Sequence, residues 1–264
     1  MGISKVVLGN RTLIDLSNIT VTPETLGEGV TAFNAQGELI TGTMKPGPAT
    51  MTVLLNGAPN EVITYTGTQN DSITLDFTGV GSLQLDAGVY TFSGGISGYQ
   101  KTVEIRQDSI VNVWPNGTMV YWYGRKFYTP TASKYMPSGE TTNGKAPTIT
   151  EYDTYFNVKQ PAVSGNYCGS ALFQNIVTKG GVPTVLSSGK LNTNSSPPNV
   201  YFCIADSITT TQFSSIQKYP IAYQETDVKL NSVADGTYTL AISVRNNAQN
   251  YHGHVDVYAI YFEE

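Results

Sequence analysis

Apolar and polar residues alternate along most of the chain, in short runs separated by turn residues. Residues 51–55 alternate in this way, and Ile73, Leu75 and Phe77 are spaced to share one face of a later run. Because successive side chains of a strand point to opposite faces, this period predicts half-buried β-strands. The chain is therefore predicted to be all-β.

The aromatic residues are densest at 111–128, VNVWPNGTMVYWYGRKFY, which contains both tryptophans of the chain. Large aromatic side chains bury much apolar area, so this stretch predicts a centre of packing. We interpret it as the last strand of one β-domain, ending at residue 113, followed by a turn and the first strand of the next, 119–123. Alternation within 119–123 predicts that Tyr121 and Tyr123 share one face and that Trp122 lies on the other.

Two boundaries divide the chain into three predicted domains. The first is at residues 45–48, Lys-Pro-Gly-Pro, which are typical of a stiff linker, and the second is at the turn before residue 117. The prediction is a short N-terminal module with a hairpin (1–47), a small antiparallel β-sandwich (48–116) and a C-terminal sandwich (117–264). The last would be jelly-roll-like, with roughly eight to ten strands.

Within the N-terminal module, Thr22 and Pro23 fit the cap and the first position of a one-turn helix. Residues 30–33 and 38–43 flank a four-residue loop that ends in Gly37, which predicts a β-hairpin. So small a unit buries little apolar surface alone. We therefore expect it to pack on its own oligomer or to dock into a larger assembly.

A turn followed by tyrosine occurs twice, in LDAGVY at 85–90 and VADGTY at 233–238. In each case the turn is predicted to begin a strand. Tyr90 would share a face with Phe92, and Tyr238 would share the buried face of its strand with Leu240, Ile242 and Val244.

Composition narrows the classes of function. Charged residues make up 13% of the chain, against about 25% in average domains, and the net charge is −5. Phosphate binding needs clustered Lys and Arg, so nucleic acid is not expected as a partner. The sequence has no apolar run of about 18 residues, which predicts no membrane insertion, and its start lacks the apolar core of a signal peptide. We expect synthesis in a cytoplasm without general export.

Candidate metal sites are sparse. Cys168 and Cys203 lie far apart, and we interpret them as small buried hydrophobic residues, with a late disulfide as the alternative. His252, His254 and Asp256 would share one strand face, where metal binding, general-base chemistry and an exposed polar face compete. One strand supplies too few ligands, so the exposed face is preferred. No metal and no cofactor are predicted.

Catalytic motifs are absent from the sequence: there is no G-x-S-x-G, no H-E-x-x-H and no phosphate loop. Glycosidase chemistry needs only two acids at a set distance, and several acids could supply it. Those acids are Asp206, Asp227, Asp235, Glu263 and Glu264. Any sandwich offers such pairs by chance, so no catalytic residue is assigned and the chain is predicted not to be an enzyme.

Aromatic side chains are the candidate ligand-binding residues, because a flat ring suits the C–H face of a sugar. For each of them, packing in the core is the alternative. The candidates are Tyr135, Trp122, Tyr123, Tyr152 and Tyr155. Residues 129–150 are rich in Pro, Gly, Ser and Thr, and a loop of this length is usually functional or disordered. Tyr135 is the preferred candidate because it lies in this loop.

Two stretches resemble known families. Residues 20–44, TVTPETLGEGVTAFNAQGELITGTM, resemble a module that recurs in tail and baseplate proteins of phages infecting Gram-positive bacteria. The matching positions are Thr20, Val21, Thr22, Leu26, Gly29, Thr31, Ala32, Gly37, Ile40, Gly42 and Thr43. Residues 85–115 resemble PEGA-like and carboxypeptidase-regulatory-like sandwiches, which serve as spacers or surface-binding units.

The first resemblance implies a virion protein of a tail tip or baseplate, made in the cytoplasm of the bacterial host. Its N-terminal module would attach to other virion proteins, and its C-terminal domain would bind a cell-surface glycan. A homo-oligomer is expected, with a trimer as the form common in such fibres. The alternatives are a structural or head-decoration protein without a receptor and a polysaccharide depolymerase, which would need a deep acidic cleft.

Overall fold

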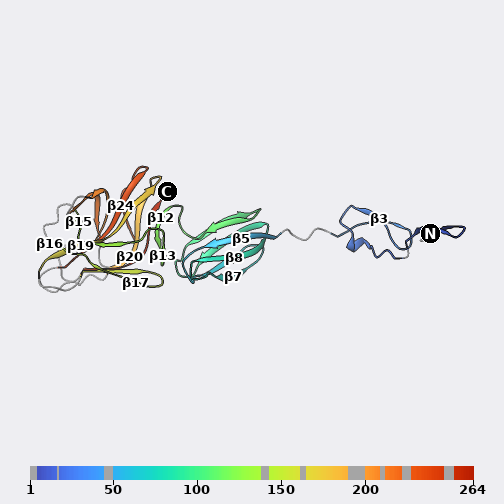
Figure 1. Cartoon of the computed structure of the whole chain (residues 1–264), viewed down its shortest axis with the longest axis horizontal. Helices are drawn as coiled ribbons and strands as arrows, with labels where there is room; N and C mark the ends of the chain where they lie inside the picture. The colour runs from blue at the N-terminus through green and yellow to red at the C-terminus, as the bar shows by residue number, and fades with distance from the viewer. Residues whose placement is uncertain are drawn as a thin grey trace. The chain divides into compact units, whose positions relative to one another are not determined.

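β-strands make up nearly all of the regular structure in the computed structural model (Figure 1). The structure describes residues 5–16, 18–44, 50–137, 143–160, 165–189, 200–208, 212–221, 227–246 and 253–264. A 3-10 helix, η1 (Pro23–Thr25), is the one helical element among them. The predicted all-β class is confirmed. The chain divides into two compact units, Met1–Met51 and Thr52–Glu264, which are described separately.

The described part of the N-terminal unit consists of two antiparallel hairpins and the helix η1. The strands are β1 (Lys5–Leu8) with β2 (Arg11–Asp15), and β3 (Thr31–Phe33) with β4 (Leu39–Thr41). Both elements predicted for 22–43 are confirmed. The backbone N–H of Thr22 donates to Thr25 Oγ1 at 2.9 Å at the start of η1. Gly37 closes the β3–β4 loop with a φ of 76°.

Large apolar side chains of this unit face solvent. Among its described residues Gly42 alone is buried. The exposed apolar residues are Val7, Leu8, Leu13, Ile14, Val30, Phe33, Leu39 and Met44. The described part of the unit therefore has no apolar core of its own, as the small size of the predicted module leads one to expect.

The second unit begins with a smaller sandwich of two sheets, ordered β10-β9-β6-β7 and β11-β5-β8. Its strands are β5 (Thr50–Asn56), β6 (Val62–Thr66), β7 (Asp71–Thr74), β8 (Val80–Asp86), β9 (Gly88–Gly94), β10 (Gln100–Ile105) and β11 (Ser109–Asn112). Tyr90 and Phe92 are fully buried on one face of β9, as predicted. The first and last strands, β5 and β11, pair in parallel, so this sandwich is not purely antiparallel.

Phe77 does not join the core of the smaller sandwich, contrary to the prediction. It is 80% exposed, because β7 ends at Thr74 and the chain then turns. Asp76 Oδ1 accepts hydrogen bonds from the backbone N–H of Thr78 at 2.8 Å and of Val80 at 3.0 Å. This side chain–backbone turn breaks the alternation before Phe77.

The larger sandwich follows, and its described residues form two seven-stranded sheets. The β25 sheet has the order β13-β12-β25-β18-β17, with β20 along the other edge of β25 and β23 beyond it. Its strands are β12 (Gly117–Trp122), β13 (Arg125–Lys126), β17 (Thr148–Glu151), β18 (Phe156–Lys159), β20 (Val182–Gly189), β23 (Asp227–Lys229) and β25 (His254–Glu263).

The β24 sheet has the order β14-β19-β24-β21-β22-β15, with β16 paired to β19. Its strands are β14 (Thr131–Ser133), β15 (Met136–Pro137), β16 (Asn143–Gly144), β19 (Tyr167–Thr178), β21 (Val200–Ile208), β22 (Gln212–Pro220) and β24 (Gly236–Asn246). Leu240, Ile242 and Val244 of β24 are fully buried in the core between the two sheets, with Tyr238 packed against it, as predicted. Cys168 and Cys203 are both buried.

Tyr121 lies on the opposite face from Tyr123, which corrects the predicted alternation of this strand. The pairing of β12 with β25 shifts between Met119 and Tyr121, so Val120 and Tyr121 both belong to the core between the sheets. Met119 and Trp122 lie on the other face of the sheet, and Tyr123 packs against them. A β-bulge adds one residue to a strand, and every side chain beyond it changes face.

This outer face of the β25 sheet packs on the smaller sandwich. The shared apolar cluster, called here the junction cluster, is made of Ala58, Trp114, Met119, Trp122, Ala259 and Tyr261, with Tyr99, Tyr123 and Leu186 packed against it. Arg125 adds a polar contact, since its Nη1 lies 3.3 Å from Asn56 Oδ1 and its guanidinium carbon lies 5.1 Å from the centre of the Trp114 ring. The aromatic stretch 111–128 thus joins the two sandwiches.

Candidate functional site

Four tyrosines form a continuous series of ring contacts beside the junction cluster, and we call them the tyrosine row. Tyr152 and Tyr155 are stacked, with ring centres 4.5 Å apart and planes inclined by 16°. Tyr155 lies 5.5 Å from Tyr258, and Tyr258 lies 6.1 Å from Tyr123. Tyr152 is 50% exposed, and the other three are half-buried. The row thus presents aromatic surface to solvent.

Strand alternation places two members of the row. The turn between β17 and β18 is closed by a hydrogen bond from Tyr152 N to Tyr155 O at 2.8 Å. The next residue, Phe156, is fully buried in the core, so Tyr155 faces outward. On β25, Val257 is fully buried and Tyr258 is turned to the outer face in the same way.

Tyr123 reaches the row from a two-residue hairpin loop between β12 and β13. Trp122 pairs with Arg125, and the two loop residues, Tyr123 and Gly124, have φ values of 42° and 95°. A Cβ on Gly124 would lie 1.9 Å from the carbonyl oxygen of Asp153. Glycine therefore lets this loop lie directly against the β17–β18 turn, which brings Tyr123 to the other tyrosines.

Polar groups border the rings. Asn157 Nδ2 donates to Asp256 Oδ1 at 2.6 Å, and Ser188 Oγ lies 3.3 Å from Tyr258 Oη. His254 shares the face of β25 with Asp256 and Tyr258, so the predicted alternation of this strand is confirmed; His252 lies outside the described residues. The border thus combines a carboxylate, an amide and hydroxyls.

Burial and neighbouring acids raise the pKa of two tyrosines of the row, Tyr155 and Tyr123. Burial raises the pKa of Tyr155, and the carboxylate of Asp256 and the neighbouring tyrosines raise it further. Burial also raises the pKa of Tyr123, with a contribution from Glu61 of the smaller sandwich. Protonated phenols can both donate and accept hydrogen bonds. The row can therefore bind a ligand that has a flat apolar face and hydroxyl groups at its edge.

The structure brings together three of the five candidates predicted from sequence, namely Tyr123, Tyr152 and Tyr155. Trp122 lies 5.1 Å from the Tyr123 ring but is 1% exposed, so it supports the row and offers no face to a ligand. Tyr258 was not predicted. The alternation of residues 254, 256 and 258 is the sequence signal that could have placed Tyr258 on the same strand face as His254 and Asp256.

Tyr135, the preferred candidate, lies away from the row, on the outer face of the β24 sheet. It packs against a buried cluster that includes Leu172 and Phe213. Ser170 Oγ donates to its carbonyl oxygen at 2.9 Å. β14 and β15, which flank Tyr135, pair with β19 and β22, so this part of the predicted 129–150 loop belongs to the sheet. Residues 138–142 lie outside the described part of the chain.

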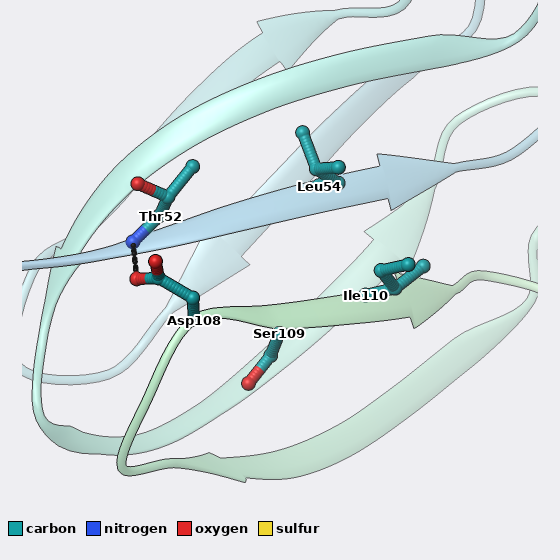
Figure 2. Close-up of a pocket in the computed structure, with 5 residues that line it drawn as sticks. All are labelled: Thr52, Leu54, Asp108, Ser109 and Ile110. Atoms are coloured by element: carbon teal, nitrogen blue, oxygen red, sulfur yellow. Dashed lines mark hydrogen bonds between the residues drawn. The ribbon is translucent and has the colours of Figure 1, made fainter.

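Hollows also occur away from the row, and two of them are lined by described residues. One, of about 310 Å³, lies on the smaller sandwich between β5 and β11 (Figure 2). Leu54 and Ile110 are side by side there, 39% and 66% exposed. Asp108 Oδ1 accepts the backbone N–H of Thr52 at 2.8 Å. The hollow is mainly apolar and has few polar groups to orient a ligand.

The other hollow, of about 340 Å³, lies between β22 and β23 and is mainly polar. Its lining residues are Ile216, Gln217, Lys218, Tyr219, Lys229, Leu230 and Asn231. Gln217 bonds the backbone of Asn231 through both ends of its amide, at 2.6 and 2.9 Å. Lys229 pairs with Glu263 at 2.6 Å. The amide of Gln217 and the ammonium group of Lys229 thus already have partners within the protein.

Within the described ranges, no three His, Cys, Asp or Glu side chains are grouped so that they could hold a metal ion. The same residues include no helix long and apolar enough to cross a membrane.

Comparisons with known proteins show low similarity. No protein-family model and no curated protein matches the chain. A DUF3823 family protein from Parabacteroides merdae is 9% identical, with a TM-score of 0.25, over 83% of this chain and 100% of that chain. A carbohydrate-binding module of the β-sandwich superfamily is 9% identical, with a TM-score of 0.30, over 83% and 99%. The secreted serine protease VesC from Vibrio cholerae is 9% identical, with a TM-score of 0.33, over 94% and 53%. TM-scores this low assign no function.

Proposed function

We propose that this chain is a virion protein of a phage of Gram-positive bacteria and that it attaches to the host by binding a surface carbohydrate. The observation that carries the binding role is the tyrosine row, with stacked Tyr152 and Tyr155 at its exposed end. A sugar ring has an apolar C–H face and hydroxyl groups around its edge. The row offers the matching features, aromatic faces with hydroxyls and a carboxylate at their border.

The geometry also favours modest but specific binding. Tyrosine has two side-chain torsions, so it gives contact area at a low entropic cost. Asp256 is oriented by Asn157, at 2.6 Å, and can accept hydrogen bonds from sugar hydroxyls. These groups bind and orient a ring, and the sequence has no recognised catalytic motif. Binding, not hydrolysis, is therefore the proposed role.

The virion role is supported by the N-terminal unit. Its residues 20–44 resemble the module of phage tail and baseplate proteins, and its described part exposes eight large apolar side chains, from Val7 to Met44. Such a surface fits association with other virion proteins and with copies of this chain. Several copies on one virion would raise weak binding per site to strong attachment.

Binding of the intact chain to purified cell walls from a panel of Gram-positive bacteria tests the glycan role. Tyr152→Ala and Tyr155→Ala should each weaken saturable binding by about tenfold, as loss of an aromatic anchor does. Tyr219→Ala is the matched control, because Tyr219 is 42% exposed on β22, in the other sheet. Absence of saturable binding, or equal binding by all three variants and the unmodified chain, would overturn the proposal.

The virion role needs a separate experiment. Phage particles purified from the strain that encodes this chain should contain it, as detected by mass spectrometry, and antibodies to the chain should reduce adsorption. A chain present in the lysate but absent from purified particles would contradict the virion role. If purified particles contain the chain but the chain itself does not bind cell walls, the decoration alternative is supported.

A further inference from the structure

Tyr123 occupies a backbone position that disfavours its residue type. It is the first residue of the two-residue loop between β12 and β13, with a φ of 42°, and Gly124 follows with 95°. Positive φ at both residues is the pattern of a type I′ turn, where Asn-Gly is the preferred pair. A bulky residue with positive φ is uncommon, and such outliers gather at functional sites.

Neighbouring residues cover only part of the Tyr123 side chain. The Tyr123 ring contacts Trp122, at 5.1 Å, and Tyr258, at 6.1 Å, but it remains half-buried. Its hydroxyl lies 3.5 Å from the carbonyl oxygen of Ser97, in the smaller sandwich. The ring is thus held between the tyrosine row and the smaller sandwich, with one part open to solvent.

The turn of the smaller sandwich behind Tyr123 is held firmly in place. Glu61 is fully buried and accepts hydrogen bonds from Ser97 N and Ser97 Oγ, both at 2.9 Å, and from Ala58 N at 2.9 Å. The carbonyl of Ser97 that faces Tyr123 therefore has a fixed position. Ile96, beside it in the chain, is 42% exposed.

We infer that Tyr123 contacts the bound ligand and that the binding surface extends along the row to the junction with the smaller sandwich. This inference rests on the carbohydrate-binding function proposed above. It gives the smaller sandwich a part in recognition, since Ser97 and Glu61 fix the place that the Tyr123 ring occupies. A need for the ring in binding accounts for a strained tyrosine at a turn position that asparagine would suit.

Two substitutions separate the strain from the ring. Tyr123→Ala and Tyr123→Asn both remove the ring, but Asn tolerates a left-handed backbone better than Ala does. The Asn variant should therefore unfold at a higher urea concentration than the Ala variant. At Tyr219, on strand β22, the same pair of substitutions should show no advantage for Asn, because the backbone there is extended. Equal midpoints for the two Tyr123 variants would contradict the strain.

Binding of the intact chain to the same purified cell walls tests the contact. Both ring-less variants should lose about tenfold in affinity despite their different stabilities, and Tyr123→Phe should stay within about threefold of the unmodified chain, because it keeps the ring. A role in stability alone predicts instead that binding is unchanged wherever the variant is folded, as judged by circular dichroism.

The outcomes distinguish the two proposals. If Tyr152→Ala weakens binding and folded Tyr123→Ala does not, the inference about Tyr123 is wrong and the proposed function stands. If neither the row variants nor the Tyr123 variants change binding, or the unmodified chain does not bind, the proposed function fails and this inference fails with it.

Discussion

The hydroxyl of Tyr90 donates a hydrogen bond to the carbonyl oxygen of Asp86, four residues earlier, at 3.0 Å. Tyr238 makes the same bond to Ala234 at 3.1 Å, in the larger sandwich. In both sandwiches, therefore, a tyrosine at the start of a central strand forms a hydrogen bond to the backbone of the turn that precedes the strand. A similar tyrosine corner is known from immunoglobulin-like sandwiches.

Replacing either tyrosine by phenylalanine should therefore destabilise the chain, by different amounts. Tyr90 is fully buried and its hydroxyl also bonds Thr68, so Tyr90→Phe loses two part-buried hydrogen bonds and should lower the free energy of unfolding by about 1–3 kcal/mol. Tyr238→Phe should cost about 0.5–1.5 kcal/mol, because its carbonyl partner can reach water. Urea unfolding measures both. Tyr65→Phe, whose ring lies 6.4 Å from Tyr90, is the control and should change stability less than Tyr90→Phe.

Gly124→Ala should destabilise the fold much more than a glycine-to-alanine substitution that causes backbone strain but no steric clash. An added Cβ would lie 1.9 Å from the Asp153 carbonyl oxygen, at a φ of 95°. The expected loss of stability is at least about 2 kcal/mol, since the clash adds to the left-handed strain. Gly98→Ala is the control: its φ is 66°, but no atom lies within 4 Å, so about 1 kcal/mol is expected. Equal losses would show that the loop does not press on the β17–β18 turn.

Stability should fall at alkaline pH partly because of Tyr261. Burial, with help from Glu263 and Asp227, raises the pKa of Tyr261 to about 12, from 10.0. Between these values the unfolded chain loses the phenolic proton and the folded chain keeps it, so the folded state binds more protons and stability drops as pH rises. The contribution is complete below pH 10 and is lost by about pH 12, roughly 2–3 kcal/mol in all.

Urea midpoints measured from about pH 8 to about pH 12 test this. Tyr261→Phe has no proton to lose, so its stability should fall less steeply. Some dependence should remain, because burial also raises the pKa of Tyr121. An equally steep fall in the variant would mean that Tyr261 does not resist ionisation.

Local patterns predicted the elements well, and the site only in part. The hairpin whose loop ends in Gly37 and the two turn–tyrosine pairs follow from residue types within a few positions of one another. Phe77 and Tyr121 were placed on the wrong faces, because a side chain–backbone turn at Asp76 and a bulge in β12 interrupt the period of two. Neither feature has a strong signal in a single sequence.

The tyrosine row could not be predicted as a row, because its members come from three separate places in the chain. Tyr123, the pair Tyr152 and Tyr155, and Tyr258 meet only after β12, β18 and β25 have paired. The sequence favours Tyr135 because its segment is polar and rich in turn residues. Its short flanking strands instead pair with the β24 sheet. The residues close to Tyr135 in the sequence do not show that this segment pairs with strands far away in the chain.

The junction cluster makes a prediction about the tryptophans. Trp114 is 8% exposed and Trp122 is 1% exposed, because the two sandwiches cover them together. In a fragment of residues 117–264, Trp122 is the remaining tryptophan and has lost Ala58 and Tyr99 of the smaller sandwich. Its fluorescence should therefore shift to longer wavelength, with stronger quenching by acrylamide.

The intact chain with Trp114→Phe is the reference, since it also reports on Trp122 alone. Circular dichroism of the fragment should retain its β-sheet signal, so that a shift reflects exposure of the outer face of the β25 sheet and not unfolding. The exposed apolar face should also lower the solubility of the fragment. If a folded fragment and the reference have the same emission maximum, the smaller sandwich does not cover Trp122. Binding studies of the C-terminal sandwich alone would then be justified; otherwise the intact chain is required.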